Sequence, residues 1–178
     1  MMKAEFQKDE SAAIGLPLRI SITIIVFSVI LLLSWKFMYD FNSDAMERNL
    51  MGELDLIDKR AAAMYIHGGA RDIGYQDNFS GTLENINIRI PDNAAFIVLG
   101  AMPQADGMPP ETRETHADNV YYYVLTDGRI QTRSSIARFS ANDTNLNKPV
   151  VLYPGDHELI LELVKNNNGT YVKIEENN

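Results

Sequence analysis

An uninterrupted apolar stretch dominates the first quarter of the chain. Residues 20–35 read ISITIIVFSVILLLSW, without a charge, a proline or a glycine. As a helix this stretch extends about 24 Å, whereas the hydrocarbon core of a bilayer is about 30 Å thick. Further apolar residues on both sides supply the missing length. The pattern therefore predicts a transmembrane helix over residues 16–39.

The residues that flank this stretch suit a membrane interface. Arg19 and Lys36 bound it, and their aliphatic stems let the charges reach the headgroups. Trp35 and Tyr39 are typical of the interfacial aromatic belt. A buried core helix is the alternative, because the strictly uncharged stretch is shorter than about 18 residues. A soluble domain of this size rarely surrounds a helix that is apolar on every face, so the membrane interpretation is favoured.

A second helical pattern follows at residues 40–68. Apolar residues recur there at three- and four-residue spacing: Met46, Leu50, Leu54, Ile57, Ala61 and Met64. This is the stripe of an amphipathic stem helix, which Gly68 and Gly69 end. Stem and anchor form either one rod or two pieces joined near residues 40–43. The stripe needs an apolar partner, for which we expect the following domain, with a coiled-coil stalk as the alternative.

From about Thr82 onward the pattern changes to that of β-strands. Apolar alternation or β-branched and aromatic enrichment marks residues 83–90, 94–99, 120–125, 130–139, 150–153, 158–164 and 170–174. The segment TDGR at 126–129 is a strong hairpin turn. Residues 102–119 read as a long surface loop. We predict an α+β fold, in which residues 69–178 form an antiparallel β-sandwich or small barrel packed on the helix.

Positive charges give a weak indication of topology. Lys3, Lys8 and Arg19 precede or begin the apolar stretch, which places the N-terminus inside by the positive-inside rule. No A-x-A cleavage site follows the stretch, so a conventional cleaved signal fits less well than a signal-anchor. Residues 1–15 are then cytoplasmic, and the domain at 69–178 is extracellular.

The residues just before the anchor carry a short motif. Residues 8–17 read KDESAAIGLP, a charged stretch followed by Ser-Ala and an Ile-Gly pair that leads into the apolar helix. This resembles the start of archaeal type IV pilin-like proteins and archaellins, over about the first forty residues and in the layout of helix then β domain. The resemblance implies a leader-peptidase region at Lys8, Asp9, Glu10 and Ser11, with a mature N-terminus at Glu10 or Ser11.

The same resemblance implies a function. After a prepilin peptidase removes the leader, the retained apolar helix serves first as a membrane anchor and then as the core of a cell-surface filament. The expected partners are membrane lipid, the peptidase, and further copies or other pilin-like subunits. The alternative is an uncleaved signal-anchor that holds an extracellular binding or adhesion module at the membrane.

Composition excludes several other classes. The net charge of −8 and the absence of any Lys/Arg run argue against nucleic acid as a partner. No cysteine is present, which excludes a thiolate nucleophile, a cysteine-ligated zinc and a disulfide framework. The three histidines have no metal-ligand spacing, and Ser134-Ser135 lacks a nucleophile elbow. We predict no enzyme, and no catalytic, cofactor-binding or metal-binding residue.

Three Asn-x-Ser/Thr sequons follow the anchor, at Asn78, Asn142 and Asn168. All three lie in predicted loops or turns, where a glycan can be accommodated. They are candidate glycosylation sites, and they agree with an external C-terminal domain.

Overall fold

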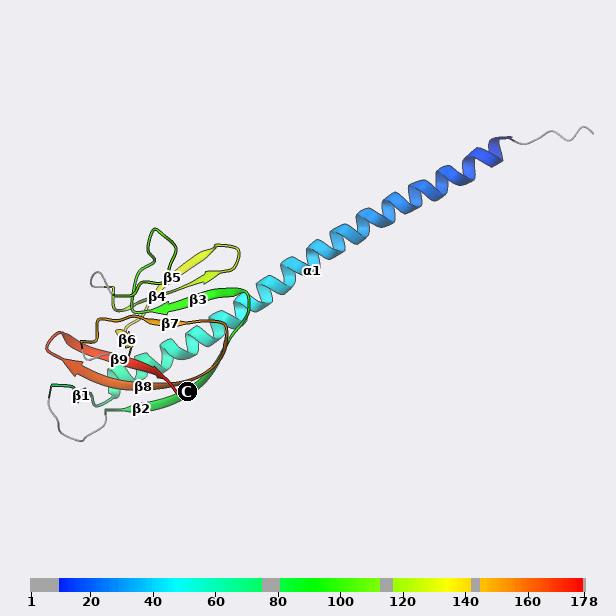
Figure 1. Cartoon of the computed structure of the whole chain (residues 1–178). Helices are drawn as coiled ribbons and strands as arrows, with labels where there is room; N and C mark the ends of the chain where they lie inside the picture. The colour runs from blue at the N-terminus through cyan, green and yellow to red at the C-terminus, as the bar shows by residue number, and fades with distance from the viewer. Residues whose placement is uncertain (1–9, 75–80, 113–116, 142–144, 178) are drawn as a thin grey trace, which may run out of the picture. The chain divides into compact units, whose positions relative to one another are not determined.

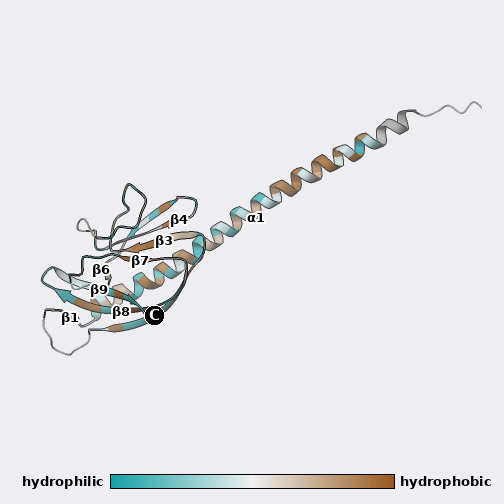
Figure 2. Ribbon diagram, viewed as in Figure 1, coloured by the Kyte–Doolittle hydropathy of each residue, from teal (hydrophilic) through white to brown (hydrophobic). Residues whose placement is uncertain are grey.

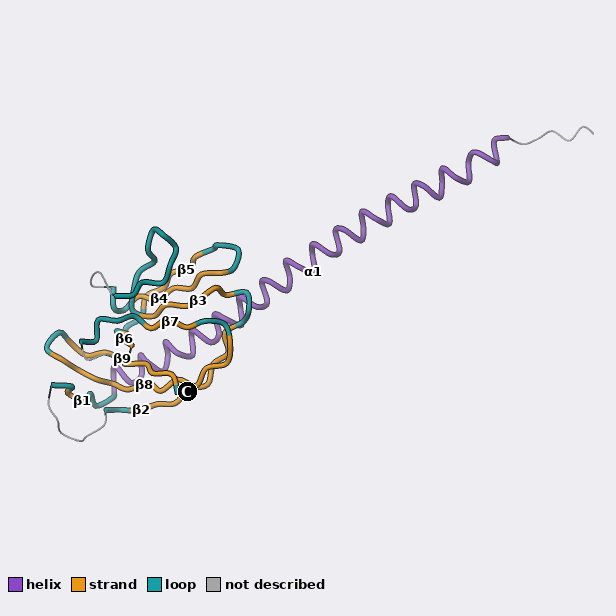
Figure 3. The backbone as a smooth tube through the Cα atoms, viewed as in Figure 1, coloured by secondary structure: helices purple, strands orange, loops and turns teal. Residues whose placement is uncertain are grey.

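A computed structural model describes residues 10–74, 81–112, 117–141 and 145–177. Over these ranges the chain forms one α-helix and nine β-strands (Figures 1 and 3). Their bounds are α1 (Glu10–His67), β1 (Arg71–Asp72), β2 (Leu83–Ile90), β3 (Ala94–Leu99), β4 (Val120–Leu125), β5 (Ile130–Ser134), β6 (Phe139–Ala141), β7 (Val150–Leu152), β8 (Gly155–Asn166) and β9 (Gly169–Glu176). The predicted α+β class is confirmed.

The chain divides into two compact units, Met1–Asp44 and Ala45–Asn178. The first unit holds the apolar part of α1, the brown stretch of Figure 2. Ser21, Thr23 and Ser28 lie in this part, and each hydroxyl donates a hydrogen bond of 2.8–2.9 Å to the carbonyl four residues earlier. These polar groups are therefore satisfied within the helix, as a lipid environment requires.

The second unit contains the rest of α1 and all nine described strands. Leu50, Leu54, Ile57, Ala61 and Met64 are buried in one cluster with apolar side chains from both sheets. The predicted stripe is thus confirmed, and its partner is the β domain. α1 is one helix through residues 40–43, and it ends where expected, with the Gly68 amide bonded to the Met64 carbonyl at 2.7 Å.

The described strands form two sheets. One has the order β5-β4-β3-β7 and is antiparallel throughout. In the other, β8 pairs antiparallel with β2 and β9 but parallel with β1, and β9 pairs parallel with β6. The prediction of a purely antiparallel domain is therefore wrong at β1 and β6. These strands have only two and three residues, too few to give a periodic signal in the sequence.

The helix, as well as the sheets, fills the core of this domain. Over the described residues the pairings leave the two sheets separate, and neither closes on itself. The predicted sandwich or barrel is not confirmed, since α1 packs against both sheets in the same apolar cluster. A second apolar cluster lies on the other face of β3 and β4: Tyr122 and Phe96 meet edge to face there, and Ala101, just before the predicted surface loop, is buried with them.

The observed strand bounds agree with the predicted ones where the sequence contains clear turn residues. β2, β3 and β4 have the predicted limits, and the β4–β5 hairpin turns at Gly128, whose φ of 86° favours glycine. β8 begins before the predicted residue 158, because Gly155 and Asp156 already pair with the end of β2.

Candidate membrane surface and polar sites

The apolar part of α1 is exposed on every side. Each large apolar side chain from Leu18 to Phe41 is solvent-accessible, from 49% at Val29 to 79% at Trp35. Residues 29–33 are five consecutive members of this set, so the exposed surface encircles the helix rather than forming a stripe. We call residues 18–41 the apolar band.

The apolar band has the length and chemistry of a membrane span. α1 is the one helix in the described part of the chain that is long and apolar enough to cross a bilayer. No charge lies between Arg19 and Lys36. Phe37 and Phe41, one turn apart, stack with ring centroids 6.4 Å apart, close to Tyr39 in the aromatic end of the band. Exposed apolar area on this scale marks an interaction surface.

Half of the predicted leader-peptidase region lies outside the described residues. Lys8 and Asp9 fall outside them, whereas Glu10 and Ser11 are the first two residues of α1. Of the sequons, Asn78 and Asn142 also fall outside. Asn168 is described: it is exposed in the tight turn between β8 and β9.

An acidic flank of α1 contacts the β4–β5 hairpin. Glu47 accepts hydrogen bonds from the Tyr123 hydroxyl at 2.9 Å and from Arg129 at 3.0 Å. Burial, together with the Glu47 contact, raises the pKa of Tyr123 to about 12. About two and three helical turns further along, the flank makes similar contacts.

The repeated contacts are made by Asp55 and Asp58. Asp55 pairs with Arg133 at 3.2 Å, and Asp58 accepts a short hydrogen bond from the hydroxyl of Ser135. The amphipathic pattern of the sequence predicted that this polar face of α1 is exposed to solvent. The partners lie more than 75 residues away in the chain, so helical periodicity alone could not reveal them.

A buried carboxylate holds the strands of the five-stranded sheet together. Glu162 on β8 is 7% exposed and receives two hydrogen bonds from Arg71, at 2.6 and 2.8 Å. Lys173 on β9 lies 2.9 Å from the same carboxylate. The hydrogen bonds from Arg71, reinforced by Lys173, lower the pKa of Glu162 to about 2. The network joins β1, β8 and β9, which is a structural role.

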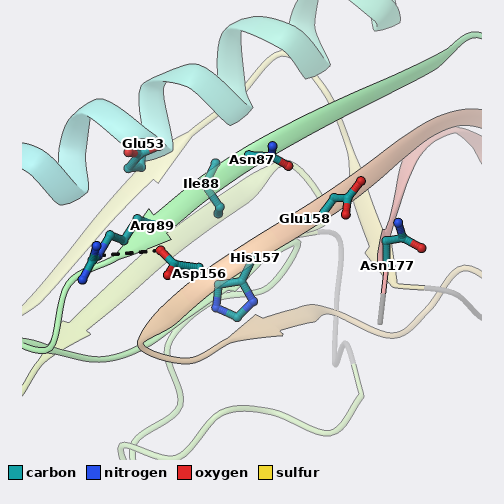
Figure 4. A pocket seen from close by; sticks show the side chains of 8 residues that line it. All are labelled: Glu53, Asn87, Ile88, Arg89, Asp156, His157, Glu158 and Asn177. Atoms are coloured by element: carbon teal, nitrogen blue, oxygen red, sulfur yellow. Dashed lines mark ion pairs between the residues drawn. The ribbon is translucent and has the colours of Figure 1, made fainter.

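A shallow hollow of about 590 Å³ lies over β2 and β8 (Figure 4). Arg89 and Asp156 form an ion pair of 3.7 Å there. His157 is engaged at both nitrogens: Nδ1 lies 2.7 Å from Glu176, and Nε2 lies 2.7 Å from the Tyr153 carbonyl. His157 therefore connects the end of β9 to the β7–β8 connection through both ring nitrogens.

No group of three or more ionisable ligand residues within the described ranges is placed to hold a metal ion. Comparison with protein-family models, curated proteins and solved structures returns no match for this chain.

Proposed function

We propose that the protein is a pilin-like structural subunit of an archaeal cell-surface filament, anchored and assembled through the apolar band of α1. The observation that carries this proposal is the exposure of the band on all sides. Removal of apolar area from water contributes about 25 cal/mol per Å², so a fully exposed helix of this composition requires an apolar environment.

Lipid provides this apolar environment before assembly, and other copies of the same helix provide it in the filament. In lipid, the band is covered by acyl chains and the backbone is satisfied by the helix itself. In a filament, apolar helices of neighbouring subunits cover one another. The uncharged stretch of the band, residues 20–35, has no polar face and suits both, because it can be covered from any direction.

The N-terminal motif supports the filament version of this proposal. Residues 8–17 resemble the processing region of archaeal pilin-like proteins, in which the apolar helix follows the cleavage site directly. The three sequons after the anchor agree with an external second unit.

The decisive experiment is the N-terminal sequence of protein isolated from its native membrane. A processed subunit begins at Glu10 or Ser11, and the same species is found in filaments sheared from the cell surface. An intact Met1 in membrane and sheared fractions alike contradicts the filament subunit and leaves the uncleaved anchored module.

Anchoring itself is tested separately. The full-length protein should remain in the membrane pellet after alkaline carbonate extraction, and protease added to whole cells should digest the second unit. Release into the supernatant contradicts the anchor, whereas a protease-resistant second unit in intact cells contradicts the proposed topology.

A further inference from the structure

Asparagine side chains gather around a second hollow, which has a volume of about 490 Å³. Asn166, Asn167 and Asn168 come from the β8–β9 turn, and Asn145 and Asn147 come from the connection before β7. Asp72, at the end of β1, also lines the hollow. Small-molecule sites in proteins occupy about 300–1,000 Å³. We call this depression the asparagine hollow.

A strained residue shapes one wall of the asparagine hollow. Leu146 has φ = 54°, in the left-handed region that costs a non-glycine residue roughly 1–2 kcal/mol. Its side chain is buried against Val164 and Tyr171 in a small apolar cluster. Because Leu146 points into that cluster, Asn145 and Asn147 on either side of it stay exposed at the hollow.

The other walls are held by hydrogen bonds. The Ile73 amide bonds to the Lys165 carbonyl at 3.1 Å, which fixes the segment after β1 beside β8. Asn166 joins two walls: its amide donates to the Asn145 carbonyl at 3.4 Å, and its oxygen accepts from the Asn168 backbone at 2.8 Å. The hollow is therefore framed by segments that the fold holds in place.

The remaining side-chain amides are available to a ligand. Those of Asn145, Asn147, Asn167 and Asn168 have no hydrogen-bond partner among the described residues, and all four residues are exposed. Each primary amide offers two N–H donors and one carbonyl acceptor. The hollow thus presents several neutral donors and acceptors from two chain segments.

The chemistry of the lining excludes most ligand classes. An anion would need a free cation, but Lys165 lies 3.7 Å from Asp72 and is paired with it. A divalent cation would need more than the one carboxylate of Asp72. An apolar ligand would find little beyond Ile73. A ligand rich in hydroxyl groups fits, because a hydroxyl both donates and accepts, as the amides do.

We propose that the asparagine hollow binds a neutral carbohydrate through the side-chain amides of Asn145, Asn147, Asn167 and Asn168. This site is independent of the apolar band and gives the second unit a binding role of its own. Without an aromatic platform among the lining residues, affinity comes from hydrogen bonds of about 1 kcal/mol each. The expected Kd is therefore roughly 0.1–1 mM.

Binding is tested with the full-length chain in a phosphocholine detergent, since sugar-headed detergents would compete for the site. The protein is produced in a host without N-glycosylation, so that Asn168 stays unmodified. Maltopentaose, cellopentaose, mannopentaose and chitopentaose serve as probes at up to about 10 mM, measured by calorimetry and ligand-observed NMR. We expect at least one of the four to bind.

Variants then locate the site. The double variant Asn147→Ala/Asn167→Ala should weaken binding at least tenfold. Asn85→Ala/Asn87→Ala, which removes two exposed asparagines of β2 outside the hollow, should leave it unchanged. Circular dichroism confirms that each variant is folded. The proposal is overturned if no probe binds at 10 mM, or if the two double variants bind equally well.

Discussion

The hydroxyl of Tyr123 on β4 donates a 2.9 Å hydrogen bond to the carboxylate of Glu47 on α1. Tyr123 is 1% exposed, and this bond joins the middle of one sheet to the first turn of the helix within the domain. The adjacent residue, Tyr122, is equally buried, but its hydroxyl has no partner in the described structure. These two neighbouring tyrosines lie on opposite faces of β4, in different apolar clusters, and only the hydroxyl of Tyr123 has a hydrogen-bond partner in the described structure.

We therefore expect Tyr123→Phe to lower the free energy of unfolding by about 1–2 kcal/mol, since it removes a hydrogen bond to a charged acceptor. Tyr122→Phe is the matched control, and it should be neutral or stabilising because it removes an unsatisfied hydroxyl. Chemical unfolding followed by far-UV circular dichroism measures both. Equal losses in the two variants would contradict the assigned contact.

The lowered pKa of Glu162 makes the stability of the domain sensitive to acid. Its pKa is about 2 in the folded chain, against an ordinary value of 4.5 for a glutamate. The stabilisation is present above pH 4.5 and is lost as the pH falls toward 2, because the unfolded chain then binds the proton more readily. At neutral pH it is on the order of 3 kcal/mol.

Glu162→Gln should remove most of this stabilisation at pH 7 and flatten the acid limb of the stability profile. Glu175→Gln is the control, because Glu175 is more exposed and contacts only Lys173 of this network. Urea unfolding at pH 7, 4 and 2.5 reports the difference. An acid limb in Glu162→Gln as steep as in the wild type would rule out this carboxylate as its source.

Replacing each of two glycines with alanine should change the free energy of unfolding in opposite directions. A Cβ on Gly81 would lie 2.0 Å from the Leu163 carbonyl oxygen, whereas a Cβ on Gly52 would meet nothing within 4 Å. Gly52→Ala should stabilise the helix by about 0.5–1 kcal/mol. Gly81→Ala should destabilise by more than 1 kcal/mol, since backbone must shift. Thermal unfolding of the two variants in the same detergent tests the pair.

A charge in the middle of the apolar band should impair membrane insertion. Phe27→Asp places a carboxylate near the centre of the span, where it costs about 3 kcal/mol. We expect a clear fraction of this variant in the carbonate supernatant. Phe27→Leu keeps the position apolar and should stay in the pellet. If both variants sediment alike, the band does not determine membrane association.

Asn168 should accept an N-linked glycan when the second unit passes through a glycosylating compartment, because the residue is exposed in a hairpin turn. Intact-mass measurement should show a glycan that both Asn168→Gln and Thr170→Ala remove. Asn167→Gln leaves the sequon intact and should retain the glycan.

A glycan at Asn168 would also occupy space at the asparagine hollow, so glycosylated protein should bind the oligosaccharide probes more weakly.

Local sequence signals predicted much of this fold. The apolar alternation at residues 83–90 and the turn residues at 126–129 are local signals, each contained in a short stretch of sequence. β2 and the β4–β5 hairpin therefore lie where expected. The apolar stripe of α1 was predicted for the same reason, because its three- and four-residue spacing is visible in the local sequence. The parallel pairing of Phe139 with Val172 joins residues far apart in the chain, and no local pattern encodes it.

The polar sites were harder to predict for the same reason. Glu162 occupies an outward position of an alternating strand, which is the normal place for a solvated residue. Its burial depends on Arg71 and Lys173, brought beside it by different strands. The Asn166–Gly169 segment was correctly identified as a turn. Only the fold brings Asn145 and Asn147 next to it.

Because Leu50, Leu54 and Ile57 are packed against both sheets, residues 45–67 of α1 form part of the centre of the second unit rather than lying on its surface. A pulling force applied to this helical segment therefore acts on the core directly. To extract the segment, several turns of interlocked side chains must slide at once, because protein interiors are close-packed. Shearing of this kind resists force better than the loss of one contact at a time.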